Sequence, residues 1–342
     1  MQHTEISYTL EGKSRADVSM SFRVIPKVKK SKALKVGTFG CLKGAYAINV
    51  TQGCSLRCAY CYARGYSTAP PKGDVFLFNN LPELLGKELD STRRRRLPSI
   101  VLFNTATDCF QPHPDILGIT YRAMVILLER GIDISFLTKG FIPERFIRVF
   151  SAYRDKVHAQ IGIVSLGENY WRTYEPGAAS PGEKLENVER LITAGVDTEV
   201  RVDPVIPFVT DTREELETLF RSLSQRGIRR VSLSYLHVRP AIQKQLRAEL
   251  PSLHRKLLES CFEGRDWVEV GMSTKTKLLP KKLRENGYER IKATAEGYGI
   301  SAAICRCKNP DMNGEFCPPP RVQMAIARVR IPPGKQLPLF SC

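Results

Sequence analysis

Hydrophobic residues in the first three quarters of the chain form short β-type runs that alternate with segments of helical periodicity. The β-type runs cover residues 45–50, 99–104, 133–138, 159–166, 198–206 and 229–236. Apolar residues recur at helical spacing over 81–96, 115–130, 142–153, 181–194, 211–226 and 240–263. Ser180 before Pro181, and Asp211 three residues before Glu214, are expected helix starts. The pattern therefore predicts six strand–helix units.

These units predict an α/β fold. The runs are mostly apolar rather than alternating, as expected of a parallel sheet that helices cover. Six units are two short of a closed eight-stranded barrel, so both a partial (β/α)6 barrel and an open doubly wound sheet fit. In either fold, ligands bind at the carboxyl ends of the strands.

The two ends of the chain depart from this alternation. Residues 1–43 are expected to form a basic lead-in, with a solvated stretch, KVKKSKALK, at 27–35. Residues 44–263 form the predicted barrel core. We interpret residues 264–342 as a C-terminal extension packed on the barrel. It combines a basic stretch, a loop-like segment that carries cysteines, and MAIARVRIP as a possible last strand.

Composition adds a class of partner and a compartment. The 342 residues carry a formal net charge of +17, which attracts polyanions and favours a nucleic acid as partner. No apolar leader and no run long enough to span a membrane is visible, so we expect a cytoplasmic protein. In a reducing compartment, clustered cysteines indicate metal binding or redox chemistry. Cys41 and Cys261, isolated in sequence, are expected to be small buried hydrophobic residues.

Basic stretches could contact the polyanion. KVKKSK at 27–32 and LLPKKLREN at 278–286 could line a groove, whereas the four arginines at 93–96 suit phosphate contact and a helix C-terminus equally well. Aromatic residues are not interleaved with these stretches, which argues against a recognisable single-strand binding module.

A group of three cysteines follows the first predicted strand. Cys54, Cys58 and Cys61 have the spacing C-x3-C-x2-C, and Gly53 precedes them. Three thiolates can hold three irons of a [4Fe–4S] cluster and leave the fourth iron open for a ligand. Zinc with a remote fourth ligand and three unrelated buried cysteines are the alternatives.

CSLRCAYC after the first strand of a β/α repeat resembles the radical S-adenosylmethionine (SAM) superfamily. With NVTQGCSLRCAYCYAR (49–64), NTATDCFQPHP (104–114), LTKG (137–140) and AGVDTEVRVDPVIPFVTD (194–211), the chain resembles its spore photoproduct lyase-like branch. The resemblance implies a partial barrel of the radical SAM type and a [4Fe–4S] cluster on Cys54, Cys58 and Cys61. It also implies SAM, cleaved to a 5′-deoxyadenosyl radical that abstracts hydrogen from a substrate, and a flavodoxin- or ferredoxin-type electron donor.

The same resemblance implies further site residues at the strand ends. Those expected to contact SAM are Tyr60, Thr107, Asp108, Lys139 and Ser165, with Glu175 and Arg201 as further candidates. Arg201 could instead pair with Asp203. The lyases carry a hydrogen-donating cysteine where this chain has Thr105, so Cys109, with Tyr60 or Tyr62 as relays, is a candidate for that role, and Cys109 as a buried bystander is the alternative.

Four more cysteines lie in the C-terminal extension: Cys305, Cys307, Cys317 and Cys342. They could hold a second iron–sulfur cluster or a zinc ion, or bind no metal. The leading functional hypothesis is a radical SAM enzyme, lyase or modifying, that acts on a nucleic-acid base. The alternatives are the same chemistry on a peptide, protein or metabolite, and a nucleic-acid-binding protein with a structural cluster.

Overall fold

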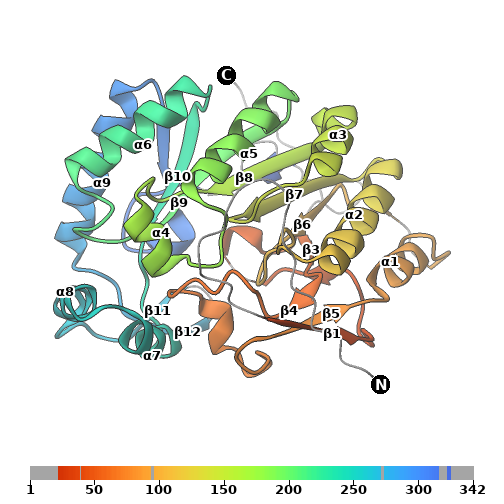
Figure 1. Ribbon diagram of the computed structural model, residues 1–342, viewed down its shortest axis with the longest axis horizontal. Helices are drawn as coiled ribbons and strands as arrows, with labels where there is room; N and C mark the ends of the chain where they lie inside the picture. The colour runs from red at the N-terminus through yellow and green to blue at the C-terminus, as the bar shows by residue number, and fades with distance from the viewer. Residues whose placement is uncertain (1–21, 39, 94–95, 271–272, 316–321, 325–342) are drawn as a thin grey trace, which may run out of the picture.

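The computed structural model describes residues 22–38, 40–93, 96–270, 273–315 and 322–324. Its main feature is a curved sheet in the order β2-β3-β6-β7-β8-β9-β10-β13 (Figure 1). Neighbouring strands from β3 to β13 are parallel, and β2 is antiparallel to β3. The strands are β2 (Lys35–Val36), β3 (Tyr46–Ile48), β6 (Ile100–Phe103), β7 (Asp133–Thr138), β8 (Val157–Gly162), β9 (Asp197–Val205), β10 (Arg230–Tyr235) and β13 (Ser301–Ile304).

The six predicted strands are confirmed as β3, β6, β7, β8, β9 and β10, in chain order along the sheet. Every residue of β6 and β8 is buried; β6 is apolar throughout, as predicted for a covered parallel strand, whereas β8 includes the buried polar residues His158 and Gln160. The sheet has β2 at one edge and β13 at the other, so the barrel is partial, as predicted.

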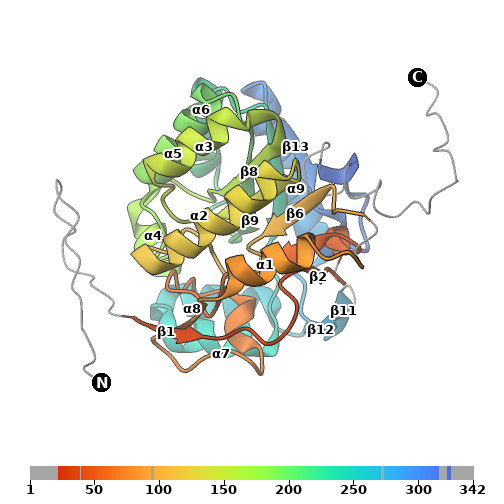
Figure 2. The same ribbon diagram turned by 90° about the vertical axis from the view of Figure 1, so that its right-hand side faces the viewer.

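Helices join the successive strands and cover the outer side of the sheet (Figures 1 and 2). Helix α5 packs on β8 and β9, α2 packs on β7, and α1 lies beside α2. The helices are α1 (Leu81–Leu89), α2 (Pro114–Glu129), α3 (Glu144–Ala152), α4 (Glu168–Tyr174), α5 (Pro181–Thr193), α6 (Arg213–Gln225), α7 (Pro240–Glu249), α8 (Ser252–Phe262) and α9 (Lys281–Gly297). A short 3-10 turn, η3 (Arg154–Lys156), precedes β8.

Three helix predictions need correction. The segment 240–263 is two helices, α7 and α8, because Pro251 has no N–H to continue the first. Helix α1 ends at Leu89, so Arg93 and Arg96 lie beyond its last turn and do not complement its dipole. Helix α6 is capped by Thr212, whose side chain accepts from the Glu215 N–H, and not by Asp211. The predicted helix start at Ser180 is confirmed: Ser180 is the N-cap of α5 and forms a capping box with Glu183.

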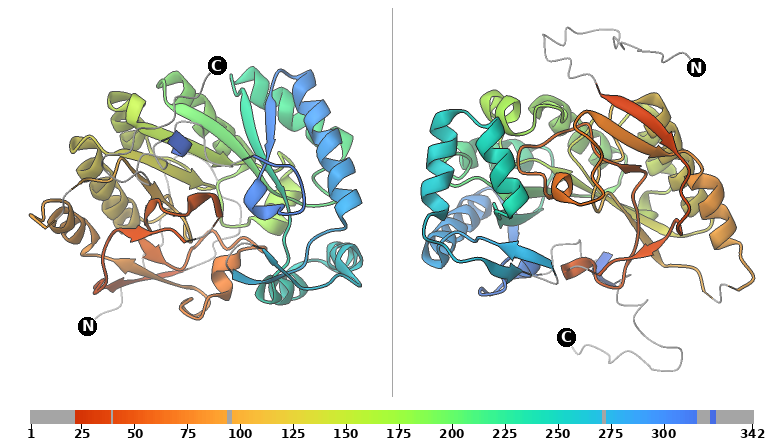
Figure 3. Two further views of the ribbon diagram at one scale, coloured as in Figure 1. Left: turned by 180° about the vertical axis from the view of Figure 1, so that it is seen from behind. Right: turned by 90° about the horizontal axis from the view of Figure 1, so that it is seen from below.

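Both ends of the chain contribute more regular structure than the hydrophobic pattern predicted. In the lead-in, β1 (Arg23–Lys27) pairs with β5 (Asp74–Phe78), which also pairs with β4 (Thr51–Gln52). In the extension, β11 (Val268–Val270) and β12 (Ser273–Thr276) form a hairpin. Helix α9 packs on α6, and β13 extends the main sheet beside β10 (Figure 3). Helix α9 has five buried positions, and one of them is the charged Arg284 and another is Gly287, so its apolar helical spacing was obscured.

The hydrophobic core is continuous between the sheet and its helices. Within the part of the chain that the structure describes, no helix combines the length and apolar character needed to cross a membrane.

Candidate active site

The three-cysteine loop begins at the end of β4 and ends in the 3-10 turn η2 (Tyr62–Gly65). Gly53 has φ +90°, and a Cβ there would lie 2.5 Å from Cγ of Pro70, so glycine is required at this bend. Two backbone hydrogen bonds hold the loop in place. Ala59 N donates to Tyr174 O at 2.9 Å, and Gly177 N donates to Leu56 O at 3.2 Å. The segment 174–177 after α4 therefore supports the cysteine loop.

Helix α7 supports the same loop from the other side. The side-chain amide of Gln245 donates to the Cys61 carbonyl at 3.2 Å, and Arg64 of η2 forms an ion pair with Glu249. Seen from below, η2 lies beside α7 (Figure 3, right). The helices that follow the sixth strand thus close one side of the site.

The three thiols lie where a cation would stabilise their ionised forms. Burial raises the pKa of Cys58 to about 12, and burial also raises the pKa of Cys54 and of Cys61. A thiol with a raised pKa stays protonated at neutral pH unless a metal takes the place of the proton. Three such thiols on one loop fit iron ligation, because thiolates are the ligands that iron–sulfur clusters use.

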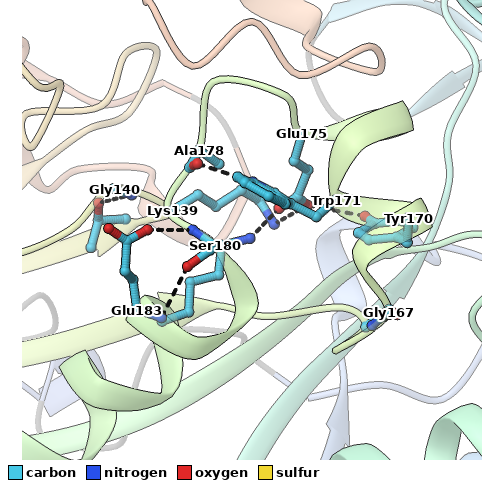
Figure 4. Close-up of polar contacts among 12 residues, drawn as sticks. Lys139, Gly140, Gly167, Tyr170, Trp171, Glu175, Ala178, Ser180 and Glu183 are labelled. Atoms are coloured by element: carbon cyan, nitrogen blue, oxygen red, sulfur yellow. Dashed lines mark hydrogen bonds and ion pairs between the residues drawn. The ribbon is translucent and has the colours of Figure 1, made fainter. Parts of the chain in front are cut away.

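Glu175, at the C-terminus of α4, is the centre of a buried polar cluster beside this loop (Figure 4). Its side chain is fully buried and accepts hydrogen bonds from Lys139 Nζ at 2.9 Å and Tyr170 OH at 3.0 Å. Tyr60 OH and Lys184 Nζ also donate to it. Four donors from separate segments therefore meet on one carboxylate.

The Glu175 carboxylate lies in direct contact with two lysine ammonium groups in this cluster. Burial alone would raise the pKa of Glu175, but the ammonium groups of Lys139 and Lys184 outweigh burial and hold it well below its usual range. Burial lowers the pKa of Lys184, and Glu175 opposes that effect. Tyr60 and Lys139, both predicted SAM contacts, are thus fixed at the edge of the cysteine loop by Glu175, and their role toward SAM stays a prediction.

Asp108 joins the ends of β6 and β7. Its carboxylate accepts from Lys139 N and Phe110 N, both at 2.8 Å, and from the Thr138 hydroxyl at 2.8 and 2.9 Å. Burial raises the pKa of Asp108 even so. Thr107, beside it, is buried and donates from its backbone N–H to Asn49 Oδ1 at 3.3 Å. These partners show what positions both residues, while their contact with SAM stays a prediction.

Ser165, just after β8, and Arg201, in the middle of β9, each have a protein partner. The Ser165 hydroxyl donates to Glu215 at 2.6 Å and accepts from Gly167 N at 2.9 Å. Arg201 pairs with Asp203 at 2.8 Å, the alternative that the sequence left open for it. Lys308 also reaches Asp203, at 2.6 Å, and the two cations outweigh burial and hold the pKa of Asp203 well below its usual range.

An exposed aromatic pair lies next to these charges. Tyr62 and Tyr66 of the cysteine loop are 40% and 45% exposed and meet edge to face, with ring centroids 5.8 Å apart. The guanidinium of Arg239 lies 5.4 Å from the Tyr62 ring centroid. His237, at the end of β10, has a buried Nε2 without a hydrogen-bond partner within the described residues. Burial, together with the charge of Lys308, lowers the pKa of His237 to about 3.

Cys109 lies in the hydrophobic core, with 1% of its surface exposed. Thr120 donates to its carbonyl at 3.0 Å, and burial raises the pKa of its thiol. Thr105 accepts from the Asn49 amide at 2.8 Å, and Tyr62 OH donates to the Thr105 carbonyl. Tyr62, and not Cys109, therefore borders the exposed side of the site.

Comparison with known proteins identifies the family. Residues 48–223 match the family model "Radical SAM superfamily". The chain belongs to the radical SAM superfamily. A radical SAM enzyme uses a [4Fe–4S] cluster and SAM, and the thiol set of Cys54, Cys58 and Cys61 suits that cluster.

Individual proteins are similar to this chain in structure or in sequence. Spore photoproduct lyase superimposes with a TM-score of 0.65 at 16% identity, over 82% of this chain and 81% of that one. An uncharacterised protein of Mycobacterium tuberculosis is 26% identical over 80% of both chains. The Radical SAM Nalpha-GlyT isomerase of Pseudomonas phage M6 is 22% identical over 74% of this chain and 51% of that protein.

Several residues of this radical SAM enzyme's site were missed by the sequence analysis. Lys184 lies on the predicted helix α5, where a charged residue gives no sign of burial, and Lys308 lies in a segment interpreted as loop. His237 follows the sixth strand, so a search for polar residues at the strand ends would have found it.

The predicted burial of Cys41 is confirmed, but Cys41 is not isolated in space. It lies against Cys305 and Cys307, and the three Sγ atoms are all within 4.8 Å of one another. Cys317 and Cys342, predicted with Cys305 and Cys307 as metal ligands, lie outside the described residues. Cys261 is half-buried.

Proposed function

We propose that this radical SAM enzyme modifies or cleaves a nucleic-acid base bound at the mouth of its partial barrel. The observation that carries the proposal is the exposed pair Tyr62 and Tyr66, with Arg239 on the Tyr62 ring, directly after the last cysteine of the loop. Aromatic rings and guanidinium planes stack on bases of any sequence, and cations beside them attract phosphates.

The charge around the pair supports the same substrate class. Arg201, Lys308 and Arg239 supply three cations near the ends of β9 and β10, and Asp203 is the acid that Arg201 and Lys308 share. The net charge of +17 also favours the binding of a polyanion. Spore photoproduct lyase, whose fold is similar, has been solved with a dinucleoside spore photoproduct.

The cofactor pair of the superfamily supplies hydrogen-atom abstraction, and the chain's own residues supply binding and orientation. The Glu175 cluster holds Tyr60 and Lys139 beside the cysteine loop, and Asp108 ties the ends of β6 and β7 under them. Tyr62 and Tyr66 hold the base at the exposed side. Helix α7 holds the cysteine loop and its aromatic pair in position through the hydrogen bond from Gln245 to the Cys61 carbonyl.

Thr105 argues against transfer of the lyase reaction unchanged. Its hydroxyl is a very poor hydrogen-atom donor, and Cys109 is buried in the core. Of the candidates for returning a hydrogen atom to the product, Tyr62 is the one that a base at the mouth of the barrel contacts. Base modification therefore fits this chain better than the repair of a thymine dimer.

The test is binding and turnover with defined oligonucleotides. Fluorescence anisotropy across a salt series should show weaker binding at higher salt, because phosphate contacts release counterions. Tyr62→Leu and Arg239→Gln should each weaken binding by about tenfold, the scale of one lost stacking contact. The matched control is Arg122→Gln, an exposed arginine that pairs with Glu83 on another face.

Turnover is followed as 5′-deoxyadenosine formed under anaerobic reducing conditions. We expect oligonucleotides to increase its yield. Salt-independent binding that neither variant changes would contradict the nucleic-acid substrate. A yield that rises only with peptides or metabolites would instead place the same chemistry on those substrates.

A further inference from the structure

We propose that Cys41, Cys305 and Cys307 bind a single metal ion, expected to be zinc, at a second site separate from the radical SAM loop. Their three Sγ atoms lie within 4.8 Å of one another. Cys41 is 6% and Cys305 1% exposed, and Cys307 is half-buried against them. The Sγ atoms of Cys305 and Cys307 are 3.2 Å apart, well beyond the roughly 2.05 Å of a disulfide bond.

The size of the group distinguishes one ion from a cluster. Thiolates about 2.3 Å from a common zinc ion, at tetrahedral angles, lie about 3.8 Å from each other. The three Sγ atoms of Cys41, Cys305 and Cys307 all lie within 4.8 Å of one another, which is compatible with that spacing. Thiolates on different irons of a [4Fe–4S] cube are separated by the cluster itself and lie farther apart. The compact group therefore favours a mononuclear site over the second iron–sulfur cluster.

The backbone segments that carry the three thiols lie in close contact. The turn η1 (Gly40–Leu42) contacts the turn η4 (Arg306–Lys308). Gly40 has φ +48°, and a Cβ there would lie 2.8 Å from Cβ and 3.0 Å from Sγ of Cys307. Glycine at this position lets the lead-in approach the C-terminal cysteines directly.

Hydrogen bonds hold Cys305 at both its backbone N–H and its backbone carbonyl. Its N–H donates to Leu233 O of β10 at 2.9 Å, and its carbonyl accepts from the Asn309 amide at 2.9 Å. Arg306 N donates to Glu315 O at 2.8 Å. Two of the three ligands thus come from a segment anchored to the main sheet.

Metal binding would exchange each thiol proton for the cation and release the protons to solvent. Three thiolates occupy three corners of the tetrahedron that zinc prefers and leave the fourth position for another ligand. The ion would join the lead-in to the extension. It would also fix η4, whose Lys308 reaches Asp203 at the end of β9.

The experiment is metal analysis of the full-length protein, purified anaerobically, with iron, zinc and sulfide counted per chain. We expect about one zinc in addition to the iron of the radical SAM cluster. Cys307→Ala should lose the zinc and keep the iron and sulfide. Cys261→Ala, a half-buried cysteine elsewhere in the chain, is the matched control and should keep both.

X-ray absorption at the zinc edge tests the same site without a variant, in case Cys307→Ala does not fold. A sulfur shell at about 2.3 Å is expected. A shell of nitrogen and oxygen alone, or wild-type protein with no metal beyond the first cluster, would overturn the proposal. Loss of several irons with matching sulfide from Cys307→Ala would overturn the single ion in favour of a second cluster.

Discussion

Cys54, Cys58 and Cys61 lie on one short loop, whereas Cys41, Cys305 and Cys307 are brought together from opposite ends of the chain. The first group is surrounded by buried charges, with Glu175, Lys139 and Lys184 behind it. The second is enclosed by close backbone contacts at Gly40 and at the end of β13. The first group follows β4, whereas in the second Cys41 precedes β3 and Cys305 follows β13. Different interactions therefore hold the two groups.

The different surroundings of the two cysteine groups suit two different roles. A loop that holds a reactive cluster needs an adjustable polar environment, because substrate and cofactor bind and leave beside it. A group that joins two chain ends needs only to stay closed, which packing and a tightly held ion achieve. Changes in one region should therefore leave the other largely intact.

The largest effect is expected from Cys58→Ala. Removing one ligand of the radical SAM cluster should lower 5′-deoxyadenosine formation by at least about a thousandfold, the scale of losing an essential catalytic group. Iron should fall with it, and zinc should not. Concurrent loss of zinc would break the comparison, because it would show that the two sites form together.

Glu175→Gln tests the electrostatic support of the first region. It leaves Lys139 and Lys184 in the interior without their carboxylate, which should cost about 3–5 kcal/mol of unfolding free energy. Urea denaturation at neutral pH measures the loss. Glu168→Gln, on an exposed residue paired with Arg172, is the control and should change stability by less than about 0.5 kcal/mol.

The same residue predicts a pH dependence. Because the folded pKa of Glu175 lies below its unfolded value of about 4.3, its contribution is full above that value and is lost as the pH falls toward the folded pKa. Wild-type stability should decline below about pH 5, more steeply than that of Glu175→Gln. Equal slopes would place the acid sensitivity elsewhere.

Gly40→Ala tests the packing of the second region. The new Cβ meets Cys307 and also sits at a positive φ, so a loss of about 2–4 kcal/mol and of zinc is expected. Gly73→Ala is the matched control, since its φ is +92° and nothing lies within 4 Å of its Cβ position. It should show the backbone strain alone, about 1 kcal/mol, and retain zinc.

Lys308→Met tests the link between the regions and should have the smallest effect. Asp203 keeps Arg201 as a partner, so stability should fall by about 1 kcal/mol or less. Oligonucleotide affinity should weaken a few-fold with zinc content unchanged. An altered zinc content would mean that Lys308 supports the metal site itself.

Much of the candidate site could be predicted from local spacing. The trio of cysteines lies on one short loop, and Lys139 and Ser165, which the family resemblance indicated, lie where predicted strands end at one edge of the sheet. Lys184 could not be predicted, because a lysine on an amphipathic helix is ordinarily solvated. Its burial follows from Glu175, which approaches it from another segment.

Local patterns in the chain predicted the parallel sheet, its six strand–helix units and the position of the cysteine loop, because each depends on neighbouring residues and short-range periodicity. The order of the six strands followed from the partial barrel that the family resemblance implied, since periodicity also fitted an open doubly wound sheet. Only the tertiary structure decided that Cys41 meets Cys305 and Cys307, that Asp203 is shared by Arg201 and Lys308, and that β13 extends the sheet. Those contacts join segments far apart in sequence, and no local pattern specifies which distant segment will supply the partner.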